Sequence, residues 1–338
     1  MAYTTIDDPS AYFKVQLYTG NGSANHAITF DDTDTDMQPD MVWIKNRDAT
    51  DTHLIFDSVR GATKYVTPSE HPNPTEVTDT DTLDSFTSDG FQVDADVKVN
   101  TNTEKYVAWC WKESATSGFD IVEWSGNSTN RTISHSLSAV PHFMFVIAKG
   151  DDNRTITYHK NNTSAPETEY LMMAYANATS DSADYWNDTA PTSSVFTVGT
   201  ANEVNDTGNT YVGYLWTGKQ GFSKFGSHVG NGNADGVFLW MGFRPAFFMC
   251  KRTDSTNNWL MFDNKREGFN KDGAGGNDEL QADTEGVEAS SERCDFLSNG
   301  VKIRSSGGWG NASGGNYIWI AFAEAPLVNS NGVPCNAR

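Results

Sequence analysis

Residues 102–112, NTEKYVAWCWK, decide the fold because the chain contains this stretch three times. It returns as NTYVGYLWTG at 209–218 and as NYIWIAFAE at 316–324, so that its leading tyrosine recurs at intervals of about 105 residues. Each copy is a short run of aromatic and β-branched residues that follows a polar approach. Such a run predicts a β-strand buried on both faces. We interpret it as the closing strand of a repeated unit.

A second strand recurs at the same interval. It opens with proline and ends with lysine, and it occupies residues 39–45, 141–149 and 245–251, the middle version being two residues longer. The strand after it ends in Asp57 in the first copy and in Asp263 in the third, and Arg60 and Arg266 follow. The middle copy has His159 there and no arginine. The duplication is therefore closest between the first and third copies.

These recurrences predict an all-β chain of three tandem β-sandwich, jelly-roll-like repeats of about 105 residues, related by an approximate rotation. The repeats span 12–112, 119–217 and 222–325, with an N-terminal arm at 1–11 and a C-terminal tail at 326–338. Strands of four to eight residues, loops rich in Gly, Asn, Asp and Thr, and 12% aromatic content favour this class. One weak helical pattern, at 167–178, predicts a helix. Apolar anchors near each end suggest that one or both ends are ordered by contact.

The composition restricts the partners. The chain has 44 acidic and 24 basic residues, a formal net charge of −20, and no Lys/Arg cluster of the kind that neutralises phosphates. We therefore expect no nucleic-acid partner and no binding to anionic membranes. The first residues contain no signal peptide and no stretch is long and apolar enough to enter a membrane. We expect synthesis in the cytoplasm.

Metal and cofactor sites have little support. Residues 31–36, DDTDTD, place carboxylates at alternating positions, a spacing that can surround calcium. They lack the glycine and the later glutamate of an EF-hand loop, and the other two units have no such run. A solvated acidic loop is the favoured interpretation, calcium the alternative. We expect no metal and no cofactor.

Catalytic motifs are absent too, and we expect no enzyme. The histidines form no HExxH pair, and neither a GxSxG elbow nor a phosphate-binding Gly-rich loop occurs. The Asp57–Arg60 and Asp263–Arg266 pairs fit either an anion or sugar contact or a braced turn, and their repetition favours the braced turn. Trp186 and Trp309 lie in polar stretches and are candidate sugar contacts. The tryptophans within strands are expected in the core.

Several segments together resemble one family. IDDPSAYF at 6–13, PDMVWIKNR at 39–47, LIFDSVRGATK at 54–64 and YVAWCWK at 106–112 are similar to a domain of virion and tail-fibre-like proteins of marine tailed bacteriophages. AFAEAPLVNSNGVPCNAR at 321–338 resembles the C-terminal end of the same proteins. The resemblance covers residues 6–112 and 317–338 and is thinner over the middle repeat. It implies a phage particle protein without an assigned activity, and it carries over no functional residues.

The resulting hypothesis is a virion structural protein exposed on the particle, associated with the tail or fibre and involved in host attachment. Its partners would be other virion proteins, further copies of itself as a homo-oligomer, and a host surface glycan or receptor. One alternative is a capsid decoration (cement) protein, since three units in one chain can mimic a trimer at a local three-fold. A carbohydrate-binding module is the alternative from another class.

Overall fold

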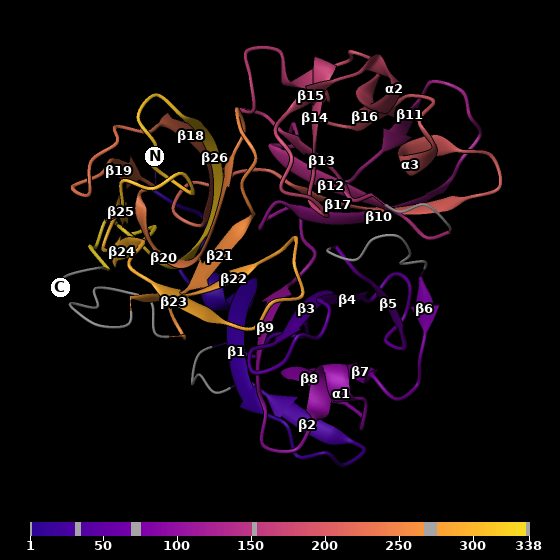
Figure 1. Cartoon of the computed structure of the whole chain (residues 1–338). Helices are drawn as coiled ribbons and strands as arrows, with labels where there is room; N and C mark the ends of the chain where they lie inside the picture. Colours follow the sequence, from indigo (N-terminus) through magenta and orange to yellow (C-terminus); the bar gives the residue numbers. More distant parts are fainter. Residues whose placement is uncertain (1, 31–34, 69–75, 151–153, 267–275, 336–338) are drawn as a thin grey trace.

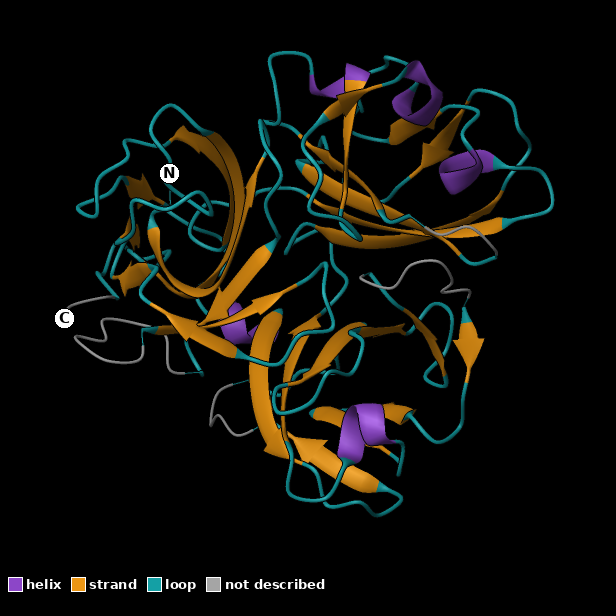
Figure 2. Ribbon diagram, viewed as in Figure 1, coloured by secondary structure: helices purple, strands orange, loops and turns teal. Residues whose placement is uncertain are grey.

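Three large antiparallel sheets with one strand order succeed each other along the chain. The computed structural model describes residues 2–30, 35–68, 76–150, 154–266 and 276–335. Strands dominate, and the helices are short single turns (Figure 2). The predicted all-β class is confirmed. Figure 1 shows the three sheets, with a smaller partner sheet each, as three units around a common centre.

The large sheets have six strands each. In the first unit their spatial order is β1 (Phe13–Thr19), β9 (Lys105–Trp111), β3 (Met41–Asn46), β4 (Leu54–Asp57), β5 (Lys64–Val66) and β6 (Val77–Thr78). In the second unit it is β10 (Phe119–Ser125), β17 (Thr210–Trp216), β12 (Phe143–Ala148), β13 (Ile156–His159), β14 (Glu169–Met172) and β15 (Ser180–Asp181). In the third it is β18 (Ser223–Val229), β26 (Asn316–Pro326), β20 (Phe243–Arg252), β21 (Leu260–Asp263), β22 (Asn277–Gln281) and β23 (Ala289–Ser291).

A small sheet covers one face of each large sheet. The small sheets contain β2 (His26–Thr29), β8 (Gly90–Val93) and β7 (Leu83–Thr87); β11 (Arg131–Ser134) and β16 (Val195–Val198); and β19 (Phe238–Trp240), β25 (Gly300–Ile303) and β24 (Cys294–Leu297). The helices are α1 (Val97–Asn100), α2 (Ala183–Trp186) and α3 (Asn202–Asn205), with 3-10 turns η1 (Pro9–Ala11) and η2 (Pro166–Thr168). Among the described residues, no helix has the length and apolarity that crossing a membrane requires.

The closing strand is buried on both faces, as the sequence predicted, because its side chains enter two different cores. In β9 every second side chain packs between the two sheets of its own unit: Tyr106, Ala108 and Cys110. The alternate side chains join a cluster to which all three units contribute: Val107, Trp109 and Trp111. We call this shared cluster the central core; its rings include Trp111, Trp216 and Phe322. The Trp111 ring centroid lies 6.0 Å from that of Trp216 and 5.6 Å from that of Phe322.

The recurring tyrosine fixes the loop before each closing strand. The Tyr106 hydroxyl donates to the Val97 carbonyl at 2.7 Å and accepts from the Thr101 N–H at 2.8 Å. Tyr211 and Tyr317 make the same two kinds of bond in their own units. Buried backbone groups need hydrogen-bond partners, and the tyrosine supplies them for two groups of the loop. It thereby holds the loop against the closing strand. The tyrosine recurs for this structural reason.

The recurring glycine after each opening strand is required by close backbone packing. A Cβ on Gly20 would lie 2.1 Å from the Thr101 carbonyl oxygen, far inside contact distance. Gly126 and Gly230 face equivalent carbonyls at 2.0 and 2.2 Å. The adjoining loop carries a buried asparagine in all three units, which accepts from the residue after the glycine. The Gly-Asn pairs thus tie the opening strand to the loop before the closing strand.

The predicted helix at 167–178 is wrong. The segment contains η2 and then strand β14, which pairs with β13 through Ile156–Met172 and Thr157–Leu171. The helical pattern was weak, and strand pairing at the sheet edge outweighs a weak local preference.

The described parts of both ends pack onto the rest of the chain. Ile6 is buried in the central core, and the Tyr3 hydroxyl donates to the Gly242 carbonyl at 2.7 Å. The Ser330 N–H donates to the Asp7 carboxylate at 2.6 Å, which joins the N-terminal arm to the C-terminal tail. The N-terminal arm, expected to lie outside the units, therefore contributes to their common core.

Trp109→Ala is expected to lower the free energy of unfolding by about 3–5 kcal/mol, since truncating a buried tryptophan leaves a cavity. Urea denaturation followed by fluorescence measures the change. The control Val97→Ala, at a side chain that is 58% exposed, should change stability by no more than about 0.5 kcal/mol. Equal midpoints for Trp109→Ala and the wild type would contradict the placement of this ring in the core.

Candidate functional site

The Asp57–Arg60 pair is buried where the first unit meets the second. Arg60 donates from Nε to Asp57 Oδ2 at 2.5 Å and from its backbone N–H to Oδ1 at 2.8 Å. Tyr214, on the closing strand of the second unit, donates its hydroxyl to Asp57 Oδ2 at 2.6 Å. Both charged side chains are fully shielded from solvent. The pair is a braced turn and an inter-unit contact, which supports the structural interpretation over an anion or sugar site.

The Asp263–Arg266 pair makes the equivalent contact from the third unit to the first. Arg266 Nε donates to Asp263 Oδ2 at 2.7 Å, and the indole N–H of Trp109 donates to the same oxygen at 3.1 Å. The Arg266 guanidinium also lies over the Trp109 ring, 5.6 Å from its centroid. Trp109 and Tyr214 hold the same register position in β9 and β17.

The remaining contact, from the second unit to the third, uses a neutral histidine. His159 occupies the register position of Asp57 and Asp263. Its Nδ1 accepts from the Asn161 N–H at 3.1 Å, so Nε2 carries the proton and donates to the Trp319 carbonyl at 3.3 Å. Burial lowers its pKa to about 3, which keeps it uncharged. The contacts therefore run from first to second, second to third and third to first unit.

The facing strand explains why the middle copy lacks the pair. At the position of Trp109 and Tyr214, β26 carries Ile320, which has no hydrogen-bond donor. A buried carboxylate facing isoleucine would lose a donor and suffer an uncompensated desolvation penalty. A neutral histidine that donates to a backbone carbonyl avoids this penalty.

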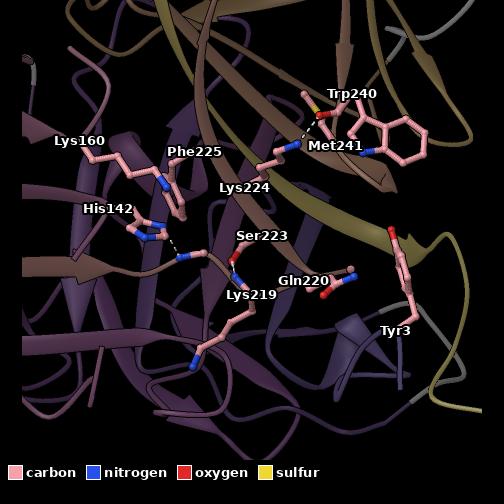
Figure 3. Close-up of a pocket in the computed structure, with 12 residues that line it drawn as sticks. Tyr3, His142, Lys160, Lys219, Gln220, Ser223, Lys224, Phe225, Trp240 and Met241 are labelled. Carbon is pink, nitrogen blue, oxygen red and sulfur yellow. Dashed lines mark hydrogen bonds between the residues drawn. The ribbon is translucent and has the colours of Figure 1, made fainter. Parts of the chain in front are cut away.

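A cavity of about 360 Å³ lies where the second unit, the connection at 218–221 and the third unit meet. Lining it are Tyr3, His142, Lys160, Lys219, Lys224 and Trp240, among others. Figure 3 shows His142 and Lys160 on one side of the cavity, Tyr3 and Trp240 on the other, and Ser223 and Gln220 between them. The cavity is our candidate functional site.

Three lysines line this cavity. Burial lowers the pKa of Lys160, Lys219 and Lys224, and the charge of Lys224 lowers that of Lys160 further. Within the described parts of the chain, no carboxylate forms an ion pair with any of the three. The Lys224 amine donates to the Trp240 carbonyl at 2.7 Å. The cavity wall is thus cationic in a chain whose net charge is −20.

His142 is a neutral part of the wall. Its Nδ1 accepts from the Gly218 N–H at 2.8 Å, which leaves the proton on Nε2. Burial lowers its pKa to about 4, and the nearby Lys160 adds to the effect. His142 can therefore donate a hydrogen bond at neutral pH but carries no charge.

The junction between the first and second units has an equivalent strand arrangement, a connection that is one residue longer, and the opposite charge. Strand register and the paired connections identify the counterparts of His142, Lys160, Gly218, Lys219 and Lys224 as Asp40, Ser58, Glu113, Ser114 and Asp120. The backbone N–H of Glu113 donates to Asp40, as that of Gly218 does to His142. The same architecture therefore forms with carboxylates and serines, and it does not require the lysines.

Trp240 lines the cavity, and it belongs to an exposed aromatic pair that the other units lack. Trp240 is 47% exposed and Phe238 is 43% exposed, both on β19. Register places small or polar residues at these positions in the other units: Ala27 and Thr29 in β2, Thr132 and Ser134 in β11. The exposed rings belong to the third unit alone.

The two tryptophans proposed as sugar contacts are buried, which corrects the expectation that they are exposed. Trp186 is 1% exposed and packs edge-on against Tyr158. Trp309 is 5% exposed and lies between Phe262 and the Arg293 guanidinium. Their polar sequence neighbours form the surface while the rings fill the sandwiches. Neither ring can stack on an external sugar.

The acidic run at 31–36 was the candidate calcium site, and residues 31–34 lie outside the described residues. Among the residues that are described, no group of His, Cys, Asp and Glu has the geometry to hold a metal ion. Lys149 is not the counterpart of Lys45 and Lys251, because register places Ile147 at their position. Lys149 pairs instead with Glu123 at 2.5 Å.

Two signals for the cavity are present in the sequence, although no motif search detects them. The connection TGKQGFSKF at 217–225 aligns with KESATSGFDI at 112–121, and this alignment replaces Glu, Ser and Asp by Gly, Lys and Lys. The alternation Phe238-Leu239-Trp240 predicts two aromatic rings on one face of a strand. Comparing the copies position by position would have found both.

Comparisons with known proteins give a family and no function. A sequence model described as Domain of unknown function (DUF7483) matches residues 8–326. A search of curated proteins found no match.

His159→Asp is expected to lower the free energy of unfolding by about 3–5 kcal/mol, because it buries a carboxylate without a partner. The triple variant His159→Asp/Asn162→Arg/Ile320→Tyr rebuilds the first contact and should recover about half of the loss. Urea denaturation of both variants measures this. If His159→Asp alone were as stable as the wild type, the contact would tolerate an unpaired carboxylate, and the explanation for the neutral histidine would be wrong.

Glu113→Gln should change how stability depends on pH. Burial, a hydrogen bond that protonated Glu113 donates to Asp120, and the charges of Asp120 and Asp40 raise the pKa of Glu113 to about 7. The folded state therefore holds this proton more tightly than the unfolded state does, and the resulting stability is lost as pH rises from about 4.5 to 7. As the pH rises from 5 to 8, the melting temperature of the wild type should fall relative to that of the variant. The control Glu292→Gln, at an exposed position, should show no such trend. If melting temperature depended on pH in the same way for Glu113→Gln and the wild type, the raised pKa of Glu113 would be refuted.

Proposed function

The chain belongs to the DUF7483 family, and we propose that it is a non-enzymatic structural protein on the outside of a phage particle. In this proposal it belongs to the tail or fibre apparatus and takes part in host attachment. Its partners are other particle proteins, further copies of the chain and a molecule on the host surface. The resemblance of residues 6–112 and 317–338 to virion proteins supports the assignment to a particle.

The observation that carries the attachment role is the difference between two otherwise equivalent junctions. One junction holds Asp40, Glu113 and Asp120, whereas the other holds three lysines beside an exposed indole. A purely structural repeat has no need for this difference in charge, because equivalent strands and an equivalent bridge form at both places. A rigid scaffold with one altered, accessible cavity is suited to binding.

The arrangement of the units favours a second candidate, a capsid decoration protein. Three units contact each other cyclically around the central core, so the outline of one chain approximates a trimer. Such an outline fits a local three-fold position on a shell as well as a trimeric fibre. A carbohydrate-binding module remains the candidate outside the particle class, and it would use the cavity rather than Trp186 and Trp309.

Gold-labelled antibody against the chain is expected to mark the tail of intact particles from the phage that encodes it. Electron microscopy of labelled particles makes the measurement, with particles lacking the gene as the control. Those particles should also adsorb to host cells more slowly. Label on the head shell would refute the tail assignment in favour of capsid decoration. Particles without any label, from a lysate that contains the protein, would exclude both.

A further inference from the structure

We propose that the cavity between the second and third units binds an acidic saccharide, with Trp240 against a sugar ring and the lining lysines, Lys160, Lys219 and Lys224, attracting its carboxylate, phosphate or sulfate group. The inference names the ligand class of the proposed attachment site and rests on that role for its biological meaning. It is tested on the isolated full chain, so its failure would leave the assignment to a particle untouched.

The charge pattern points to an anion. Several partly buried cations of this chain have carboxylate partners, such as Lys149 with Glu123 and Arg293 with Glu279. The fully buried Lys45 and Lys251 instead donate to two and three backbone carbonyls. The three cavity lysines have none among the described residues, although the chain has 20 more acidic than basic residues. Two of them, Lys160 and Lys224, lie close enough for their charges to repel each other, and this lowers the pKa of Lys160. A bound anion would relieve this repulsion.

The internal repeat shows that the fold does not require the lysines. Their counterparts at the first junction are Ser58, Ser114 and Asp120, and an equivalent bridge, one residue longer, forms there between Ser114 and Phe119. Asp120 even reverses the charge of its counterpart Lys224. The fold accepts either set of side chains, so the lysines serve the cavity.

The aromatic rim points to a saccharide rather than to a simple anion. Sugar rings present C–H groups on one face, and these pack against exposed indoles. Trp240 offers such a surface, 47% exposed, where the other units have Thr29 and Ser134. The exposed Gln220 beside it supplies an amide that can both donate and accept hydrogen bonds. A phosphate or sulfate ion alone would use neither group.

The size and the surrounding field argue against a polyanion such as nucleic acid. A volume of about 360 Å³ falls within the range of small-ligand pockets. Beyond the cavity a long polyanion would meet a surface with a large excess of carboxylates, which repels it. A short acidic unit, at the end of a glycan chain or as a side group, fits both constraints.

An acidic-glycan array followed by isothermal titration calorimetry tests the proposal. The array contains uronate, sialate, phosphorylated and sulfated saccharides with their neutral counterparts. The best acidic oligosaccharide should bind at least about tenfold more tightly than its neutral counterpart, a difference of about 1.4 kcal/mol. The preference should shrink as salt is raised, because salt screens exposed charges. Inorganic phosphate serves as the simple-anion probe.

Two variants copied from the chain's own other units locate the site. Lys160→Ser/Lys219→Ser/Lys224→Asp installs the residues of the first junction, and it should fold while losing at least about thirtyfold in affinity, about 2 kcal/mol. Trp240→Ser installs the residue of the second unit and should weaken acidic and neutral saccharides alike. The control Lys64→Gln/Lys98→Gln/Lys105→Gln removes three charges from the first unit and should leave affinity within about twofold.

Four results would overturn the proposal. They are no acidic saccharide bound on the array, equal affinity for acidic and neutral forms, unchanged binding by the junction variant, and phosphate binding that matches the saccharide and ignores Trp240→Ser. Circular dichroism and melting temperature verify the folding of each variant. Should the triple variant fail to fold, Lys160→Ser and Lys224→Gln are measured singly, and unchanged affinity in both would equally overturn the proposal.

Discussion

The structure depends on an apolar sheet face that one unit cannot cover. Each closing strand carries large apolar side chains on both faces, and the small sheet of the unit shields only one of them. The other face includes Trp111, Trp216 or Phe322 and would be open to water in an isolated unit. Because apolar burial is the main favourable contribution to folding, three such faces associate around a single core. The cyclic arrangement follows from this requirement.

At the contacts between units, the polar groups of one unit determine which side chain the neighbouring unit can bury there. A carboxylate is found at the inter-unit position only where the neighbouring strand supplies a donor, as Tyr214 and Trp109 do for Asp57 and Asp263. Where Ile320 faces it, the position holds a neutral histidine. The two sides of each contact therefore have to change together, and the apparent irregularity of the middle copy is a consequence of its neighbour.

The sequence predicted the features that local pattern controls. Short runs of aromatic and β-branched residues, each led by a recurring tyrosine, indicated the all-β class and the doubly buried closing strand, and spacing identified the Asp–Arg turns. Patterns could not show that Trp186 and Trp309 turn inward, since polar neighbours do not decide where a ring packs. The lysine cavity was also missed, because its residues come from separate strands and a connection that only strand register brings together. Position-by-position comparison of the repeats holds that information, whereas motif searches do not.

Covalent linkage of the three units gives them a freedom that separate subunits lack. In a homotrimer every substitution appears three times, so a tryptophan or a lysine cluster at one junction would appear at all of them. Here each junction has its own residues, while the central core keeps its three-part form. Linkage also makes the association of the units independent of protein concentration. The chain can thus break its own symmetry, as the cationic cavity and Trp240 show, and still retain the architecture of a trimer.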